Sequence, residues 1–341
     1  MVIKYKTGGE KSNSIILNDL RSLNENGEDS FCMLASEIQG LEAGTWSYDV
    51  ERRSCTVCVS GYRFKGNADG GNLASAGIAT GAAFWPVSTM LADYLTHDCP
   101  ILRGDSCDHL KSRNIIELGC GLGLAGIVAA TLLGETDRVV LTDGNSKVTD
   151  MARNSIDRHS ASHPRADNAS LTAEVLQWDN AGGIENINIK CASLEHARVV
   201  GSGSFDLVIA SDVIYDPNVC NEAAASLAKA ANALLRNEDD EDLPVVGATS
   251  LQAQHAWIDS SGENAKRPPT RPLCVVAFQK RSCGLHVLVD AFAKEGFEMM
   301  HPLPGNVESE GYFDSIFGDR GEVATMFWKS CICCFTRARG K

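Results

Sequence analysis

The chain lacks any long hydrophobic run, although 44% of its 341 residues are hydrophobic. No segment approaches the roughly 20 consecutive apolar residues that a membrane helix needs, so we expect no membrane partner. The first ten residues, MVIKYKTGGE, contain no apolar stretch typical of a secretory signal. These absences predict a cytoplasmic protein, with the nucleus as a second compartment.

Basic residues are also scarce relative to acidic ones. The chain has 31 Lys and Arg against 44 Asp and Glu, which gives a net charge of −13. Nucleic-acid binding depends on Lys and Arg that neutralise phosphates, so we expect no nucleic-acid partner. The acidic balance suits a basic protein substrate. No internal repeat is visible, and we expect a monomer.

The 13 cysteines do not follow a metal-binding pattern. Cys55-Thr-Val-Cys58 is the only C-x-x-C, and no second pair or paired histidines occur at zinc spacing. It lies in a predicted strand, where positions i and i+3 face opposite sides, so no metal site is predicted and redox use is the less favoured alternative. Cys331, Cys333 and Cys334 are interpreted as small core residues of another strand. The odd number of cysteines favours a reducing compartment.

The most informative stretch is 114–145, NIIELGCGLGLAGIVAATLLGETDRVVLTDGN. Its pattern predicts a strand over 115–117, a glycine-rich turn, a buried helix over 124–133 and a second strand over 138–142. Asp143 closes the second strand. This order of elements is one βαβ unit.

The glycine spacing decides which ligand the turn suits. Gly119, Gly121 and Gly123 permit a sharp strand-to-helix turn and let a ligand lie against bare backbone. The dinucleotide motif G-x-G-x-x-G requires glycine at the position of Leu124. Glu117 places a carboxylate before the first glycine, which a pyrophosphate would disfavour and a cationic ligand would tolerate.

These features favour S-adenosylmethionine, which carries a sulfonium and an α-amino group and has no phosphate. Asp143 is placed to accept hydrogen bonds from both ribose hydroxyls. A glycine-rich turn alone is weak evidence, and Asp-Gly-Asn at 143–145 is also a common turn. The strand–helix–strand context is what predicts a nucleoside-type cofactor site.

Two tryptophans are candidates for the cofactor site. Trp85-Pro86 begins a predicted helix, since proline is favourable in the first helical turn, and this places Trp85 at the edge of the site. Trp178 and Asp179 end the third predicted strand, where ligands of doubly wound sheets bind. There Trp178 would lie against adenine and Asp179 would accept from its amino group. The alternative for both tryptophans is a role in the core.

The segment after the fourth predicted strand carries the candidate catalytic residues. Asp212 is the candidate to orient a target amine by a charge-assisted hydrogen bond. Tyr215 would line the channel and contact a cation through its ring. The alternative for Asp212 is the N-cap of the following helix. Asp216 and Asn218 stand closer to that helix and compete for the cap.

Strands and helices alternate along the rest of the chain. They predict an α/β, Rossmann-like fold with a mostly parallel seven-stranded sheet, helices on both faces and an antiparallel last strand. The last two strands are predicted over 297–300 and 326–336. The strand before them lies at 245–249 or, with a stronger pattern, at 273–280. Residues 181–203 are interpreted as a loop.

The N-terminal part is predicted to be a small β-containing extension, 1–80, before the main domain, 81–341. Residues 46–65 alternate enough to predict a β-hairpin, and 237–272 is a polar loop insertion. Three further segments are interpreted as short helices (12–23 and 31–41) and a flexible connector (66–77).

Several motifs together resemble a known family. E-L-G-C-G-L-G, L-T-D-G-N, L-Q-W-D-N, the F-W-P helix start and D-V-I-Y are similar to the seven-β-strand methyltransferases of the methyltransferase-like protein-lysine group. That group includes the calmodulin-lysine, chaperone-lysine and elongation-factor-lysine methyltransferases, and the resemblance covers 55–336. It implies that Asp212 and Tyr215 lie at the target amine. It also implies cofactor contacts at Trp85, Glu117, Gly119, Gly121, Gly123, Asp143 and Trp178, and near Ala210.

The expected function is transfer of a methyl group from S-adenosylmethionine to a lysine amine of a protein. Three alternatives stay open: another acceptor (histidine, a protein N-terminus or a small molecule), a non-catalytic interaction protein that binds S-adenosylmethionine, and a nucleotide-dependent oxidoreductase. Leu124 and Glu117 argue against the oxidoreductase. The intact glycine turn and Asp143 argue against the non-catalytic protein.

Overall fold

The computed structural model describes residues 4–7, 41–64, 80–102, 112–163, 169–192, 203–236, 273–279, 283–300 and 330–338. Several predictions fall outside these residues. They are the short helices over 12–23 and 31–41, the connector 66–77, the alternative strand 245–249 and the insertion 237–272. Of the second helix only Leu41 is described, and it begins β2.

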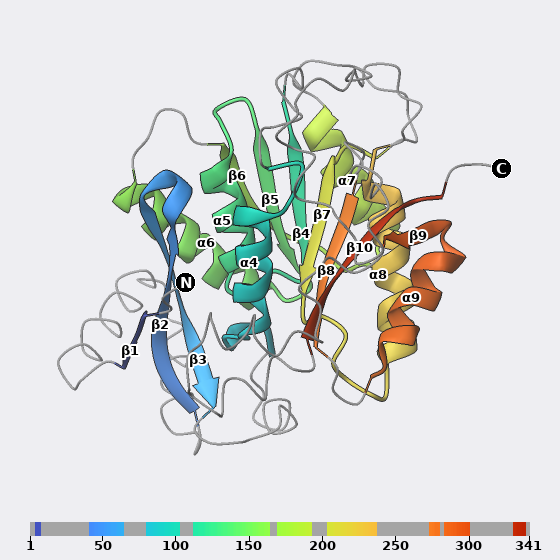
Figure 1. Ribbon diagram of the computed structural model, residues 1–341, viewed down its shortest axis with the longest axis horizontal. Coiled ribbons are helices and arrows are strands. Elements are labelled where there is room, and N and C mark those ends of the chain that lie inside the picture. The colour runs from blue at the N-terminus through green and yellow to red at the C-terminus, as the bar shows by residue number, and fades with distance from the viewer. Residues whose placement is uncertain are drawn as a thin grey trace, which may run out of the picture.

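A seven-stranded sheet forms the centre of the fold (Figure 1). Its strands are β4 (Asn114–Leu118), β5 (Arg138–Asp143), β6 (Ser170–Val175), β7 (Leu207–Ser211), β8 (Leu273–Gln279), β9 (Phe297–Met300) and β10 (Ser330–Arg337). They lie in the order β6-β5-β4-β7-β8-β10-β9. The strands from β6 to β8 are parallel to their neighbours, and β10 is antiparallel to both β8 and β9. The predicted sheet with an antiparallel last strand is confirmed.

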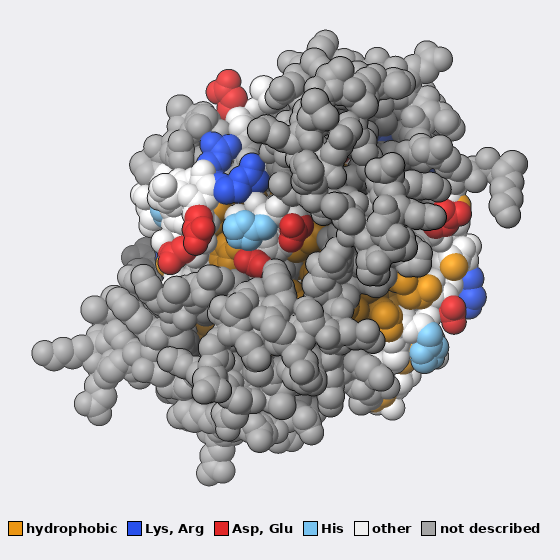
Figure 2. All heavy atoms as spheres, in the orientation of Figure 1, with side chains coloured by type: hydrophobic (Ala, Val, Ile, Leu, Met, Phe, Trp, Pro, Cys, Tyr) orange, Lys and Arg blue, Asp and Glu red, His pale blue; other side chains and the backbone are white. Residues whose placement is uncertain are grey.

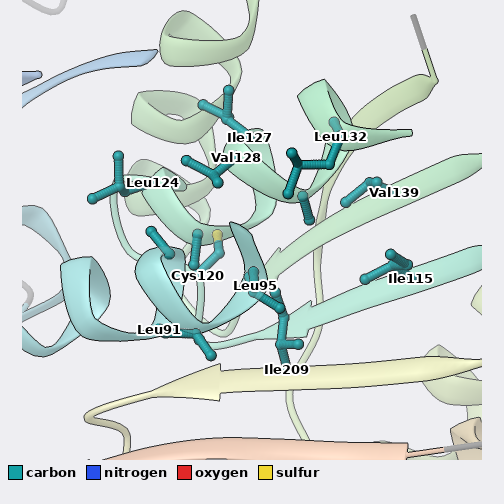
Figure 3. Packing of buried hydrophobic residues seen from close by; sticks show 14 of the residues in the cluster. Leu91, Leu95, Ile115, Cys120, Leu124, Ile127, Val128, Leu132, Val139 and Ile209 are labelled. Carbon is teal, nitrogen blue, oxygen red and sulfur yellow. The ribbon is translucent and has the colours of Figure 1, made fainter. Parts of the chain in front are cut away.

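Helices cover both faces of this sheet, as predicted. One core contains α4 (Val87–His97), α5 (Leu124–Leu132) and α6 (Ser146–Ser162), and the other contains α7 (Ala181–Ala192), α8 (Cys220–Leu234) and α9 (Leu285–Lys294). Figure 1 shows α4 and α5 in front of the sheet. Successive residues of a strand face opposite sides, so Ile115 belongs to the first core and Ile116 to the second. Figure 3 shows Leu95 of α4 beside Ile209 of β7 in the first core, with Leu91 on the same helix.

The segment 181–203 was predicted to be a loop, and this prediction was wrong because α7 forms its first part. The adjacent glycines at its start have poor helix propensity and favoured the loop. Asn180 Oδ1 accepts a hydrogen bond from the Gly183 amide at 3.1 Å and so stabilises the first turn. Ile184 and Ile187 are buried against the sheet. Burial of these side chains outweighs the weak propensity.

The predicted N-terminal hairpin is confirmed and is longer than expected. It consists of β2 (Leu41–Val50) and β3 (Cys55–Phe64), joined by the single turn Glu51–Arg53. An additional strand that the sequence did not indicate, β1 (Lys4–Thr7), pairs with β2. The hairpin packs beside α5 and α6 on the first face of the sheet. The division into an extension 1–80 and a domain 81–341 stays a prediction.

Two absences hold within the described ranges. No helix there is long and apolar enough to cross a membrane. No group of three or more His, Cys, Asp and Glu side chains in those ranges has the arrangement of a metal site. Cys333 and Cys334 are buried in β10, as predicted, while Cys331 is half-buried.

Candidate active site

A cavity of about 570 Å³ lies at the carboxyl ends of β4, β5 and β7. The connection after β4 leads to a helix on one face of the sheet, and the connection after β7 leads to a helix on the other face. The two connections therefore diverge and leave a crevice at the edge of the sheet. This is the place where the sequence predicted a nucleoside-type ligand.

The three glycines of the turn after β4 have two different roles. Gly119 and Gly121 have left-handed φ angles of 70° and 52° and line the cavity. A Cβ added at Gly119 would lie 2.6 Å from the Val213 side chain. Gly123, with a φ of 85°, does not line the cavity, and a Cβ there would lie 2.9 Å from Leu141 of β5. The first two glycines expose backbone to the cavity, and the third lets α5 pack on the sheet.

Glu117 has a structural partner that the sequence did not indicate. Its side chain is 1% exposed, and Oε2 accepts a hydrogen bond from the Gly126 amide in the first turn of α5 at 2.9 Å. This carboxyl therefore caps the helix and also lines the cavity. Burial raises the pKa of Glu117 to about 8, the Gly126 hydrogen bond opposes this rise, and the charge of Asp143 adds to it.

Asp143 is the last residue of β5 and lines the cavity. Its Oδ2 accepts from the Gly121 amide at 3.2 Å, and its Oδ1 accepts from the Asn145 amide at 2.9 Å. Burial raises the pKa of Asp143, and these two backbone hydrogen bonds lower it. Each carboxylate oxygen has a further lone pair, so the side chain can still accept hydrogen bonds from a ligand.

The entry to α4 forms an aromatic wall. Trp85 lines the cavity, and its indole Nε1 donates to the Thr80 carbonyl at 3.0 Å. Phe84 also lines the cavity and stacks on Trp46 of the hairpin, with ring centroids 4.6 Å apart and planes 6° apart. The hairpin therefore supports this wall from behind. Trp178 lies beyond the end of β6, three residues after Val175, and contributes another ring to the cavity.

Asp212 follows β7 directly and is only 7% exposed while lining the cavity. Its φ of 54° is left-handed, a conformation that strains a residue with a side chain, although Asp adopts it more readily than most residues. Its amide donates to the Ala277 carbonyl of β8 at 2.9 Å, which holds the strained turn. The helix-cap alternative for Asp212 is not realised, because the N-cap of α8 is Val219 and no side chain caps it.

Tyr215 is 39% exposed and lines the same cavity. Its phenol oxygen lies 2.7 Å from the Thr80 hydroxyl, within hydrogen-bonding distance. The structure thus brings together both predicted catalytic residues and most of the predicted cofactor residues. The predicted site residues that do not line the cavity are Gly123, Asp179 and Ala210. The cofactor contacts and catalytic roles of all the predicted site residues stay predictions.

The ionisable groups among the described residues that line the cavity are all acidic. It includes four carboxyl groups, and no Lys, Arg or His is among the described lining residues. Such a cavity favours a cationic ligand and disfavours a phosphate. The four carboxyl groups belong to Glu117, Asp143, Asp212 and Asp216.

Sequence reasoning missed several lining residues. Asn145 caps α6, since its Oδ1 accepts from the Lys147 amide at 2.9 Å, and the Asp-Gly-Asn turn carried a signal for this. Gly81 lies against the glycine turn, because a Cβ on Gly121 would be 3.0 Å from the Gly81 carbonyl. Thr80 has no sequence signal at all, because its partner Tyr215 is 135 residues away.

Comparison with known proteins indicates a family. A family model described as lysine methyltransferase matches residues 73–246. The calmodulin-lysine N-methyltransferase of Arabidopsis thaliana is 28% identical over 131 residues, which are 38% of this chain and 34% of that protein. Protein-lysine N-methyltransferase EFM3 of Saccharomyces cerevisiae is 26% identical over 166 residues, 46% of this chain and 42% of that protein. The chain thus matches less than half the length of both relatives.

Among solved structures, Aeropyrum pernix fibrillarin in complex with natively bound S-adenosyl-L-methionine aligns with a TM-score of 0.40 and 11% identity. The alignment covers 86% of this chain and 94% of that one. A TM-score this low carries no argument about ligand or activity.

Proposed function

The chain belongs to the lysine methyltransferase family, and we propose that it transfers a methyl group from S-adenosylmethionine to a lysine amine of a protein. The observation that carries this proposal is the cavity at the carboxyl ends of β4, β5 and β7, whose described lining holds four carboxyl groups and no cationic side chain. Both the methyl donor and a lysine acceptor are cations, and both suit this charge.

The residues present fit S-adenosylmethionine. Gly119 and Gly121 offer backbone without a side chain in the way, and Asp143 keeps lone pairs for ribose hydroxyls. Trp85 and Trp178 offer aromatic surfaces, which attract a cation or stack on a base. A dinucleotide would instead place two phosphates among these carboxyl groups, so the oxidoreductase alternative is disfavoured.

When bound, S-adenosylmethionine supplies a methyl group activated by attachment to a positively charged sulfur. The acceptor must be a neutral amine, whereas a free lysine has a pKa near ~10.4. The buried carboxylate of Asp212 accepts a hydrogen bond from the incoming ammonium and holds its nitrogen in the cavity. The proton passes to water before transfer. Tyr215, half exposed at the same cavity, presents its ring to the cationic side chain.

The acceptor class rests on family and chemistry together. The two relatives are named for calmodulin-lysine and protein-lysine methylation, and they support a protein partner here. The net charge of −13 supports the absence of a nucleic-acid partner. On the face shown in Figure 2, described Lys and Arg side chains lie beside Asp and Glu. We also propose a monomer located in the cytoplasm or nucleus, with 1–80 as an N-terminal extension and 81–341 as the methyltransferase domain.

The decisive experiment has two steps. First, S-adenosylhomocysteine and NAD are titrated against the protein by calorimetry, and only the former is expected to bind. Second, labelled S-adenosylmethionine is incubated with the protein and a cell extract, and the labelled residue is mapped by mass spectrometry. Label on lysine supports the proposal. Label on histidine, an N-terminus or a small molecule would overturn the acceptor, and binding without any transfer would favour the non-catalytic alternative.

A further inference from the structure

Thr80 joins two walls of the cavity that come from distant parts of the chain. Its hydroxyl lies 2.7 Å from the phenol oxygen of Tyr215, 135 residues later. Its carbonyl accepts the indole hydrogen bond of Trp85 at 3.0 Å. All three residues line the cavity. Thr80 is therefore the point that ties the aromatic wall before α4 to the segment after β7.

The residue after Thr80 lies against the opposite, cofactor-facing part of the site. A Cβ added at Gly81 would lie 3.2 Å from Oδ2 of Asp143, and one added at Gly121 would lie 3.0 Å from the Gly81 carbonyl. Neighbouring residues in one short segment thus contact both the glycine turn and Tyr215. A ligand in the cavity has this segment on one side and the β7 connection on another.

We propose that Thr80 is a positioning residue whose hydroxyl latches Tyr215 across the cavity. The latch holds the two walls together around a bound nucleoside and fixes the phenol ring beside the acceptor. Because Tyr215 is 39% exposed, its ring needs such a partner to keep one orientation against solvent. The part of this inference that concerns the acceptor rests on the proposed function, whereas the latch itself does not.

Side-chain variants separate the latch from the contact to Trp85. Thr80→Val keeps the shape of the side chain and removes the hydroxyl, while the carbonyl that binds Trp85 remains. Thr80→Ser keeps a hydroxyl and serves as the matched control. Tyr215→Phe removes the other half of the hydrogen bond, and the double variant Thr80→Val with Tyr215→Phe completes a thermodynamic cycle.

The first measurement is the affinity for S-adenosylhomocysteine by calorimetry. Thr80→Val and Tyr215→Phe are each expected to weaken binding about 3- to 10-fold, the effect of one hydrogen bond. The double variant should bind no more weakly than the weaker single variant, because both changes remove the same interaction. Thr80→Ser should stay within about 2-fold of the unmodified protein.

The second measurement is backbone hydrogen exchange of the ligand-free protein. Amides of residues 80–85 and 212–216 are expected to exchange faster in Thr80→Val than in the unmodified protein, with Thr80→Ser unchanged. This readout needs no ligand and no methyl transfer. It reports the latch even if S-adenosylhomocysteine does not bind the unmodified protein, a result that would refute the proposed function alone.

The inference is overturned if Thr80→Val binds S-adenosylhomocysteine like the unmodified protein, or if the two single effects add in full. Unchanged exchange at both walls in Thr80→Val also overturns it. A Thr80→Ser variant as weak as Thr80→Val would show that a hydroxyl at this position does not by itself sustain binding, which equally contradicts a latch.

Discussion

The two ends of the parallel sheet carry the same kind of residue and use it in opposite ways. At the amino end, Asp137 and Asp206 precede β5 and β7, and each forms an ion pair with an arginine. At the carboxyl end, Asp143 and Glu117 accept hydrogen bonds from backbone amides. Within the described residues, neither of these two forms an ion pair with Lys or Arg.

The difference shows which carboxyl groups are paired within the fold and which can interact with a ligand. Asp206 is 4% exposed, and its Oδ1 lies 2.9 Å from Nη1 of Arg236, while Oδ2 accepts from the Asn114 amide at 2.8 Å. These contacts satisfy the carboxylate and bind β4 to β7. At the other end Asp143 is held by two backbone amides and has no Lys or Arg partner among the described residues, so a cationic ligand can supply the positive charge.

The strongest test of this comparison is Asp212→Ala. Loss of the carboxylate that orients the amine should lower the rate of methyl transfer by about 10²-fold or more, the effect of a misplaced reacting group. Affinity for S-adenosylhomocysteine should be retained. Asp212→Asn is the control, because asparagine tolerates the left-handed φ of 54° and keeps the size of the side chain, while it removes the negative charge and replaces one acceptor oxygen by a donor. Activity in either variant equal to that of the unmodified protein would remove Asp212 from the mechanism.

At the amino end the expected loss is in stability. Replacing Arg236 by methionine leaves the buried carboxylate of Asp206 without its ion pair, which should cost about 3–5 kcal/mol of unfolding free energy. Denaturant unfolding measures this loss. Affinity for S-adenosylhomocysteine, measured where the variant is still folded, should not change. Weakened binding in the folded variant would mean that the two ends of the sheet are not independent.

Glu117 predicts a dependence of stability on pH. Burial raises its pKa from 4.5 to about 8 on folding, so the folded state holds the proton more tightly than the unfolded state. The resulting cost is absent below pH 4.5, grows as pH rises, and is complete above pH 8. At about 1.36 kcal/mol for each pKa unit, the full shift sets an upper limit of about 5 kcal/mol.

The measurement is the unfolding free energy at pH 5.5 and at pH 8.5. Glu117→Gln should remove up to about 3 kcal/mol of the loss between these values, because the part of the shift below pH 5.5 lies outside this window. Glu185→Gln, an exposed control on α7, should remove none. His159, whose pKa burial lowers to about 4, contributes in the opposite direction. That contribution is the same in every variant and cancels. An unchanged pH dependence in Glu117→Gln would show that the ionised form is not penalised in the fold.

The fold was predictable where local pattern and burial agree. The strand before the glycine turn, helix α5 and strand β5 lie within one or two residues of their predicted bounds, because continuous apolar runs between turns leave few alternatives. Helix α7 was missed because the glycines at its start favoured a loop and outweighed the signal of two isoleucines that are buried in the structure. Strand β1 was missed because a four-residue strand depends on its partner β2 more than on its own pattern.

The site was predictable where a residue follows a strand. Asp143 and Asp212 stand at strand ends, and parallel strands bring their carboxyl ends to one edge, so their meeting at the cavity follows from order along the chain. Contacts between distant segments could not be read in this way. Thr80 contacts Tyr215 through one hydroxyl, and Glu117 accepts from the amide of Gly126 in α5, nine residues later. Neither contact leaves a pattern in the sequence.

The smallest expected effect is a change in ligand affinity, and it is tested by comparing variants at the two ends of a single strand. Asp143 is the last residue of β5 and Asp137 immediately precedes its first, so the pair of variants Asp143→Asn and Asp137→Asn differs mainly in which end is changed. Asp143→Asn should weaken S-adenosylhomocysteine binding about 10-fold, because one acceptor oxygen becomes a donor that faces backbone amides and ribose hydroxyls.

Asp137→Asn should leave that affinity unchanged and lower the unfolding free energy instead. Asp137 accepts hydrogen bonds from the Arg113 guanidinium at 2.6 Å and from the Arg113 and Gly134 amides at 2.7 and 2.9 Å, all at the amino end of the sheet. Calorimetric titration and denaturant unfolding of both variants give the full comparison. Asp137→Asn could also weaken binding as much as Asp143→Asn does. Both losses would then reflect a general effect on the fold, and the assignment of the carboxyl end to a ligand would fail.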